Sequence, residues 1–398
     1  MSLRVLIVSH LWPRADFPHL GIFVADQVAE LANHCYISVV APVDLTHYGE
    51  ELALRELTSL MPKYRARSQP EFLPFGGLIP RVIPFRGRFL RKTFAVSTAR
   101  NLCRALDHNK LDQYDLVHAH TLFPDGLACA FWLENKSIPL VITAHGSDVH
   151  SIPSGVRKAL PAILKRADRL IAVSRSLADK LIALGADPAR ISVLPNGFSA
   201  DLFDRIPDIV RERRKIVFLG RLGAIKRVDL LIRALAHCPP DAVLEIAGDG
   251  AARSHLESLT RELNLHQRVK FLGMISREEV PRFLAGAALM CIVSEKEGWP
   301  TVIFEALACG TPVLATAVGG IPEALAKPEL GNLVPADISP PELADQIESA
   351  LMKEWDHAAI RQYALQYSWE AISSRIYQIY QQECVDLIAA GTMSTRDV

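Results

Sequence analysis

The sequence predicts an α/β protein with two doubly wound, Rossmann-like domains and a C-terminal helix. Short apolar runs that are typical of buried strands alternate with helical stretches along the whole chain, which is the pattern of parallel sheets. A polar, charged stretch over residues 201–215 interrupts this alternation near the middle. The chain has 398 residues, 49% of them hydrophobic, which is enough for two cores of ordinary size.

The first half opens with a strand, a glycine-containing loop and a helix. We expect the strand over residues 4–9, followed by a loop rich in proline and histidine that ends at Gly21. Apolar residues at helical spacing then predict a helix over residues 23–33. Such a unit often faces phosphate groups, although a single glycine identifies it only weakly.

Further apolar runs predict the remaining strands of the first sheet. We expect them over residues 36–41, 116–120, 140–144, 170–173 and 191–194. Residues 44–104 show no regular pattern.

The second half repeats the alternation after the polar stretch. Its strands are expected over residues 216–219, 243–247, 269–272, 288–293 and 313–315. The domain boundaries are therefore placed at residues 1–205, 206–367 and 368–398. The last segment is an amphipathic helix whose apolar side chains, among them Trp369 and Ile376, need a surface to bury against. Because it follows the last expected strand, we expect it to pack back on the first domain.

Composition excludes several classes of protein. No run of about 18 uncharged apolar residues predicts a membrane span, and the opening residues lack the features of a signal peptide, so we expect a cytoplasmic protein. The seven cysteines include no C-x-x-C pair, so we expect reduced thiols and neither a disulfide nor a zinc site.

The charges are unevenly distributed although the net charge is zero. Residues 1–200 carry 23 Lys and Arg against 17 Asp and Glu. Between Met61 and Arg104 lie ten basic residues and one acid, Glu71, interleaved with phenylalanines. We call residues 61–104 the basic segment. One interpretation is a solvated surface. The other is that the segment binds an anionic membrane, so that the protein lies peripherally at the inner face of the plasma membrane. Each Lys or Arg contributes about 1 kcal/mol to such binding. A nucleic-acid partner is disfavoured because the chain is neutral and has no recognition motif.

Residues 294–320 hold two carboxylates around a Gly-x-Pro turn. Because Pro300 suits the first helical position, Glu297 is expected in the loop and Glu305 one or two turns into the helix. Glu305 is flanked by apolar residues, and burying an unpartnered carboxylate is costly, so a partner is expected. The segment follows a strand, and ligands of such folds bind at the carboxyl ends of strands.

Several short motifs occur in a fixed order along the chain. Together they resemble the retaining glycosyltransferases of family 4, which have the two-domain GT-B fold; each motif alone is weak, and the resemblance covers essentially the whole chain. The motifs are His145-Gly146-x-Asp148, Pro195-Asn196-Gly197, Gly220-Arg221 with Lys226, Gly248-Asp249-Gly250, Phe271-Leu272-Gly273, Glu297-Gly298-x-Pro300, Glu305-Ala306 and Gly310-x-Pro312-Val313.

The resemblance implies two domains facing each other across a cleft and an activity. A sugar would move from a nucleotide diphosphate sugar to a hydroxyl of a glycan or a lipid-linked (polyprenyl-linked) acceptor, with retained anomeric configuration and without a metal or other cofactor. A looser similarity of residues 20–24 with Gln27 is to enzymes of bacterial surface polysaccharide or glycolipid synthesis. Since no acid is an obvious nucleophile, the resemblance implies a front-face displacement in which the leaving diphosphate helps to deprotonate the acceptor.

The resemblance also implies roles for the carboxylates and cations. Glu305 would bind the ribose and Glu297 the hydroxyls of the transferred sugar. Arg221 and Lys226 follow a strand, and two fixed cations would stabilise the charge that grows on the departing diphosphate.

Backbone groups complete the expected site. The N–H groups of Thr301 and Val302 at the helix start are candidate phosphate donors. The candidate donor-binding glycines are Gly21, Gly220, Gly273 and Gly298, and backbone groups near Gly273 would recognise the base. The first loop has Leu20-Gly21 where many family members have two glycines, which makes close backbone approach to the diphosphate less favourable there.

Three histidines follow or lie on strands of the first half. His145 ends a strand beside a glycine, and the resemblance places it at the sugar, where it would orient the sugar and support its positive charge. His118 and His120 point to one side of a strand. That spacing suits a metal, yet no third ligand is near in sequence, so structural or acceptor-lining roles are favoured. Trp299 is expected beside the sugar, where its bulk restricts the donor.

Two alternatives share these motifs. A sugar-nucleotide epimerase of the same fold would release product from the nucleotide sugar with no acceptor present. A non-catalytic sugar-nucleotide or membrane-binding partner of a polysaccharide assembly machine would bind ligands without turnover.

Overall fold

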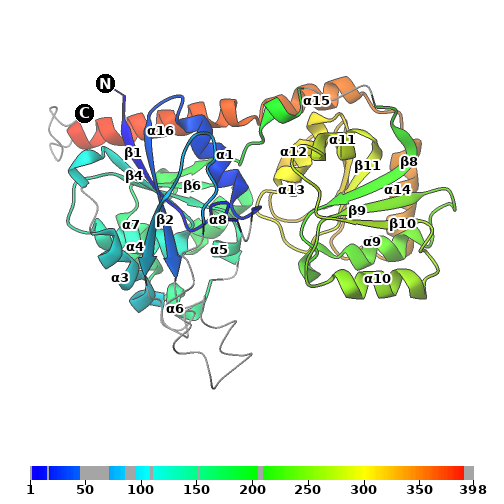
Figure 1. Cartoon of the computed structure of the whole chain (residues 1–398), viewed down its shortest axis with the longest axis horizontal. Helices are drawn as coiled ribbons and strands as arrows, with labels where there is room; N and C mark the ends of the chain where they lie inside the picture. The colour runs from blue at the N-terminus through cyan, green and yellow to red at the C-terminus, as the bar shows by residue number, and fades with distance from the viewer. Residues whose placement is uncertain are drawn as a thin grey trace, which may run out of the picture. The chain divides into compact units, whose positions relative to one another are not determined.

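The structure is a computed structural model that describes residues 2–15, 18–44, 71–85, 95–107, 111–150, 152–204 and 209–389. The chain forms two compact units (Figure 1). The first contains Met1–Pro195 and the chain from Trp369 onward, and the second contains Asn196–Ser368. The chain therefore crosses between the units at residues 195–196 and 368–369, whereas the sequence placed the first boundary at 205–206.

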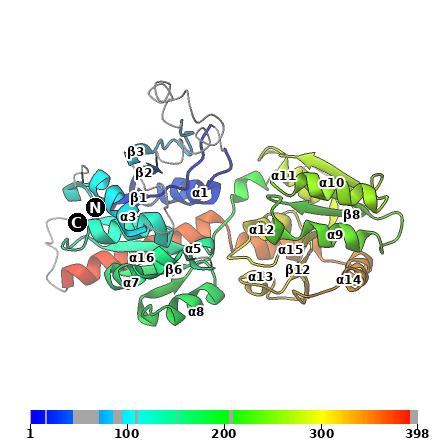
Figure 2. The ribbon, with the colours of Figure 1, turned by 90° about the horizontal axis from the view of Figure 1, so that it is seen from below.

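The first unit is built on a seven-stranded parallel sheet with the order β3-β2-β1-β4-β5-β6-β7. Strands β1, β2 and β3 follow one another at one edge (Figure 2). The strands are β1 (Arg4–Val8), β2 (Tyr36–Asp44), β3 (Arg81–Phe85), β4 (Leu116–His120), β5 (Leu140–Ala144), β6 (Arg169–Ala172) and β7 (Ile191–Val193). Among its described residues, the helices of six or more residues are α1 (Ile22–Leu31), α3 (Ala95–Leu106), α4 (Leu127–Trp132), α7 (Leu160–Arg166), α8 (Arg175–Ala183) and α16 (Trp369–Ala389).

Both faces of this sheet are covered. Val5 and Ile7 of β1 pack in one core with residues of α1 and α16. Leu6 and Val8 alternate with them and point to the opposite face, where they are also fully buried. Strands buried on both faces explain the continuous apolar runs in the sequence.

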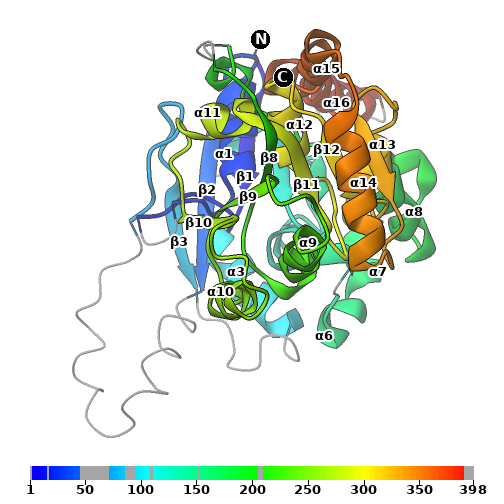
Figure 3. The ribbon, with the colours of Figure 1, turned by 90° about the vertical axis from the view of Figure 1, so that its right-hand side faces the viewer.

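The second unit has a six-stranded parallel sheet with the order β10-β9-β8-β11-β12-β13. Its strands are β8 (Glu212–Leu219), β9 (Val243–Ala247), β10 (Val269–Gly273), β11 (Ala287–Ile292), β12 (Val313–Thr316) and β13 (Gly331–Val334). Its helices of six or more residues are α9 (Val228–Leu235), α10 (Arg253–Glu262), α11 (Val280–Ala285), α12 (Thr301–Ala308), α14 (Pro340–Met352) and α15 (His357–Leu365). On one face α9 and α14 lie side by side (Figure 3). The predicted α/β class with two doubly wound sheets is confirmed.

The strand order reverses once in each sheet. In the first unit the reversal lies between β1 and β4, and in the second between β8 and β11. Ligands of doubly wound sheets bind at the carboxyl ends of the strands beside such a switch point. The loops after these four strands are therefore where functional residues are expected.

The C-terminal helix α16 packs on the first unit, as the sequence predicted. Trp369, Ile372, Ile376 and Tyr380 are at most 3% exposed, and they share a core with β1 and α1. Figures 1 and 2 show the helix running along this unit.

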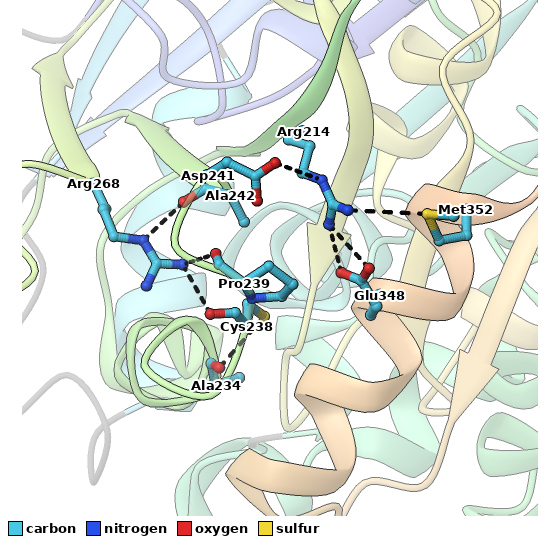
Figure 4. Close-up of polar contacts among 9 residues, drawn as sticks. All are labelled: Arg214, Ala234, Cys238, Pro239, Asp241, Ala242, Arg268, Glu348 and Met352. Atoms are coloured by element: carbon cyan, nitrogen blue, oxygen red, sulfur yellow. Dashed lines mark hydrogen bonds and ion pairs between the residues drawn. The ribbon is translucent and has the colours of Figure 1, made fainter.

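Ion pairs and carbonyl contacts tie together the amino ends of the strands in the second unit (Figure 4). Arg214 of β8 pairs with Asp241 at 2.9 Å and with Glu348 of α14 at 2.7 Å. Arg268, just before β10, donates to the carbonyl oxygens of Ala242 and Pro239 at 2.9 and 2.7 Å. These structural contacts occupy the side of the sheet at which the strands begin. A ligand site is therefore expected on the side at which the strands end.

Among the described residues, strands β3 and β13 and helix α3 were not expected from the sequence. Strand β3 contains Pro84, which a strand tolerates at the edge of a sheet, and β3 is an edge strand. Seven of the ten cations of the basic segment lie outside the described residues, so its membrane interpretation remains a prediction. Among the residues that the structure does describe, no helix is both long and apolar enough to span a bilayer.

Candidate active site

An ion pair joins the two loops at the switch point of the second sheet. Lys226 lies in the turn after β8, and Glu297 lies in the loop between β11 and α12. Lys226 Nζ is 2.5 Å from Glu297 Oε1, and Ser294 Oγ donates to the same oxygen at 2.6 Å. The Glu297 side chain is 10% exposed and that of Lys226 is 25% exposed. The pair thus places one cation and one anion where a ligand is expected, with part of each still open to solvent.

Backbone contacts hold the Glu297 loop in place. The N–H of Glu295 donates to the carbonyl oxygen of Ile225 at 2.8 Å, which links this loop to the turn that carries Lys226. A Cβ atom at Gly319 would lie 1.8 Å from the carbonyl oxygen of Glu297. Residue 319 must therefore be glycine for the loop after β12 to pack against the backbone of Glu297.

Arg221 is exposed at the end of β8. Within the described part of the chain, its side chain makes no ion pair or hydrogen bond. The backbone before it is fixed, because the Gly220 N–H donates to Ala247 at 3.0 Å and a Cβ atom at Gly248 would lie 2.0 Å from the carbonyl oxygen of Gly220. A rigid backbone thus carries a cation that is available to an anionic ligand.

Helix α12 begins at Thr301, with Pro300 as its extended N-cap residue rather than the first helical residue. Thr301 and Val302 form the first turn, where N–H groups lack partners within the helix. Glu305 is the fifth helical residue and is half-buried between the buried Phe304 and Ala306. The expected placement of the two carboxylates, one in the loop and one in the helix, is confirmed.

Trp299 is directed into the second unit rather than towards solvent. Its side chain is buried, and Nε1–H donates to the carbonyl oxygen of Asn196 at 3.0 Å. Its ring stacks on Phe304, with centroids 5.1 Å apart, and contacts Tyr367. Trp299 thus anchors the Glu297 loop to the two places where the chain enters and leaves this unit.

The candidate glycines have different environments. Gly21 has φ 65°, and a Cβ atom there would lie 2.4 Å from the carbonyl carbon of Leu11, so close packing of its own loop already requires glycine. Gly273 has φ 72° and accepts a hydrogen bond from the Gly248 N–H at 2.7 Å. Gly298 lies between Glu297 and Trp299 in the loop described above.

Four histidines gather at the carboxyl ends of β1, β4 and β5 in the first unit. His120 Nδ1 is 3.1 Å from His145 Nε2. His118 bonds through Nδ1 to the hydroxyl of Tyr380 of α16 at 2.6 Å and through Nε2 to Thr143 at 2.7 Å. His10 Nδ1 is 2.7 Å from Asp125 Oδ2.

Burial keeps three of these rings neutral. It lowers the pKa of His118 and of His145 to about 3, with a further contribution from a neighbouring histidine in each case. Burial also lowers the pKa of His120 well below its ordinary value. The ring of His145 is therefore neutral near pH 7.

Asp148 organises the loop that carries His145. Its carboxylate accepts the N–H groups of His145 at 3.0 Å, Gly146 at 2.9 Å and Leu122 at 2.8 Å. Burial raises the pKa of this carboxyl, and hydrogen bonds from backbone N–H groups oppose that rise. The Asp at the end of the His-Gly-x-Asp motif is thus a structural clamp between the loops after β4 and β5.

Sequence reasoning missed the partners of the candidates. It did not single out Ser294, His10, Asp125 or Tyr380, and only the position of His10 and Ser294 directly after strands was available as a signal. The structure brings together Lys226 with Glu297, and His120 with His145. Gly21 and His145 belong to the first unit, and the other candidates belong to the second. Within the described ranges, no three metal-ligating side chains are grouped closely enough to hold a metal ion.

The fold is similar to those of solved structures of known class. The architecture is that of GT-B glycosyltransferases: the structure of Anabaena Alr3699/HepE in complex with UDP and glucose has a TM-score of 0.71 at 21% identity, covering 96% of this chain and 100% of that one. Two family models match in tandem, Glycosyltransferase Family 4 over residues 24–202 and Glycosyl transferases group 1 over residues 200–367.

Sequence relatives agree. A D-inositol 3-phosphate glycosyltransferase of Mycobacteroides abscessus is 31% identical over 310 residues, which is 71% of this chain and 69% of that protein. A putative teichuronic acid biosynthesis glycosyltransferase, TuaC of Bacillus subtilis, is 27% identical over 93% of this chain and 99% of its own length. The chain belongs to glycosyltransferase family 4, as its motifs indicated.

The buried histidines make stability depend on pH. In the unfolded chain each takes up a proton near pH 6.5, whereas in the folded state His118 and His145 stay neutral to about pH 3. The unfolded state therefore binds more protons between these values, and stability falls as the pH falls, by up to about 1.4 kcal/mol per pH unit for each histidine. Urea unfolding followed at pH 7.5, 6.5 and 5.5 measures this slope.

The variant His118→Asn should show a smaller slope, because one titrating group is gone. His266 is exposed in the second unit, so His266→Asn is the matched control and should leave the slope unchanged. Equal slopes in wild type and His118→Asn would contradict the assignment.

Proposed function

We propose that this protein is a retaining glycosyltransferase that moves a sugar from a nucleotide diphosphate sugar to a hydroxyl of a glycan or lipid-linked acceptor. The observation that supports it most is the group at the β8/β11 switch point, where the Lys226–Glu297 pair lies in the two loops and Arg221 follows β8 without a partner among the described residues. Cell-surface polysaccharide or glycolipid synthesis is the proposed pathway class, since TuaC is named for teichuronic acid biosynthesis.

The charged side chains of the site indicate the class of sugar donor. A diphosphate needs fixed cations, and Arg221 and Lys226 supply two, so the proposal assigns no metal ion. An ammonium has three N–H donors, so Lys226 can keep Glu297 as a partner and still donate to a phosphate oxygen. The carboxylates accept hydroxyl donors: in the proposal Glu297 binds the sugar and Glu305 the ribose. The similar Anabaena protein was solved with UDP and glucose, which supports a nucleotide sugar here.

The reaction needs no protein nucleophile. The bond from the sugar C1 to the diphosphate oxygen breaks, the bond from C1 to the acceptor oxygen forms on the same face, and the acceptor proton passes to the departing diphosphate. Arg221 and Lys226 stabilise the charge that develops on the diphosphate. His145 is neutral and serves as a hydrogen-bonding group that orients the sugar.

Replacing Glu297 should stop turnover while the protein still folds. Glu297→Gln keeps the shape but removes the charge that faces Lys226 and the sugar, and a loss of about two orders of magnitude in kcat is expected. Release of nucleoside diphosphate from UDP-, GDP-, ADP- and dTDP-sugars, with and without polyprenyl-linked glycans, is the measurement. The matched control is Glu295→Gln, which neutralises an exposed acid of the same loop that pairs only with Lys296 in the described structure.

Full activity of Glu297→Gln would overturn the proposal. Product that accumulates from the nucleotide sugar alone, with an inverted hydroxyl on the sugar, would identify an epimerase. Binding without turnover of any donor and acceptor pair would indicate a non-catalytic partner.

We further propose that the basic segment holds the first unit on an anionic membrane, which suits a lipid-linked acceptor. Neutralising Arg86, Arg88, Arg91 and Lys92 should then reduce flotation with vesicles containing anionic phospholipid, since each cation contributes about 1 kcal/mol. Flotation with neutral vesicles is the control. Unchanged flotation of the variant would remove the membrane proposal and leave the transferase proposal intact.

A further inference from the structure

The two rings of His120 and His145 lie edge to edge. Their planes differ by 9° and their centroids are 5.3 Å apart. That separation is close to the 3.1 Å between His120 Nδ1 and His145 Nε2 plus the two ring radii, so the nitrogens face each other along the line of centres. An in-plane arrangement of this kind is the geometry of a well-formed N–H···N hydrogen bond.

The strand register explains why the rings meet. His120 is the last residue of β4 and pairs with Thr143 of β5, while His145 follows β5 directly. Behind them, His118 is held at both nitrogens by Tyr380 and Thr143 and packs against His120, with ring centroids 4.4 Å apart. His120 is therefore wedged between a fixed ring and His145.

Each outer nitrogen of the pair is buried without a partner in the described structure. These are Nε2 of His120 and Nδ1 of His145. A neutral imidazole carries one N–H, so the shared hydrogen bond allows two arrangements. Either His120 donates and the free N–H is on His145 Nδ1, or His145 donates and the free N–H is on His120 Nε2.

A buried N–H without a partner is rarer than a buried acceptor without one. Of the two arrangements, the one with the lower free-energy cost directs the free N–H to a place where a ligand can supply the acceptor. His145 is a half-buried residue that follows β5 directly, at the carboxyl ends of the strands where ligands bind, whereas His120 is fully buried. The free N–H therefore belongs on His145 Nδ1.

We propose that His120 is a positioning residue for His145. Its Nδ1–H donates to His145 Nε2 and so keeps His145 in the tautomer whose Nδ1–H donates to a hydroxyl oxygen of the ligand. The assignment of that oxygen to a sugar rests on the proposed function, but the tautomer itself does not.

Nitrogen-15 NMR of the full-length protein labelled in histidine tests the tautomer directly. The His145 signals are identified by their loss in His145→Asn. In wild type at pH 7.5 we expect Nδ1 of His145 to resonate as a protonated ring nitrogen and Nε2 as an unprotonated, hydrogen-bonded one. The opposite pattern, with Nε2 protonated, would overturn the proposal whatever the enzyme's activity.

Two variants separate positioning from packing. His120→Asn keeps an amide N–H near the place of Nδ1 and should preserve the His145 signals. His120→Leu removes the donor and should shift them towards the other tautomer. With whichever nucleotide sugar turns over, kcat should fall about tenfold in His120→Leu at similar KM and largely recover in His120→Asn.

Tyr380→Phe is the control for packing. It removes the hydroxyl from His118 but leaves the His120–His145 contact, so it should lower the urea midpoint of unfolding and leave the His145 signals in place. Unchanged His145 signals in His120→Leu, or an equal shift of these signals in Tyr380→Phe, would mean that His120 acts only through packing.

Discussion

The Lys226–Glu297 ion pair is the interaction on which the proposed chemistry depends. It exists because β8 and β11 are neighbours at the switch point of their sheet, although the two residues are 71 positions apart in sequence. The Glu297 side chain is 10% exposed, and a carboxylate buried to this extent needs a partner. Lys226 and Ser294 both contact its Oε1 atom, which leaves Oε2 for a ligand. Close backbone contacts at Gly319 and Gly248 keep both loops in register with the sheet.

The candidate residues of the first unit are held by hydrogen bonds between uncharged side chains. Its strand ends carry neutral histidines. Hydrogen bonds connect Tyr380 of α16 through His118 to Thr143, and His120 and His145 lie beside them. A neutral ring offers one donor and one acceptor, so its partner decides which nitrogen faces a ligand. The C-terminal helix thus takes part in the architecture of the histidine cluster as well as in the core, because Tyr380 comes from that helix.

The fold class, the family and the placement of most strands were predictable from local pattern. Continuous apolar runs identify strands that are buried on both faces, and α16 was recognisable from its apolar stripe. Strand β3 was not, because an edge strand with Pro84 has no such run. Residue types at strand ends identified Glu297, Lys226 and His145 as candidates. Their partners were not predictable, because contacts such as His118 with Tyr380, 262 residues apart, arise from tertiary packing alone. Trp299 shows the same limit: its hydrogen bond to the carbonyl oxygen of Asn196 could not be predicted from its neighbours in sequence.

The central claim is that a nucleoside diphosphate binds at the β8/β11 switch point through Arg221 and Lys226. Isothermal titration calorimetry with UDP, GDP, ADP and dTDP, on wild type and on Arg221→Ala, tests it most directly. The account predicts that at least one of the four binds and that Arg221→Ala weakens its affinity about tenfold or more, since a charged hydrogen bond contributes about 1.5–3 kcal/mol. Equal affinity in wild type and variant would contradict it.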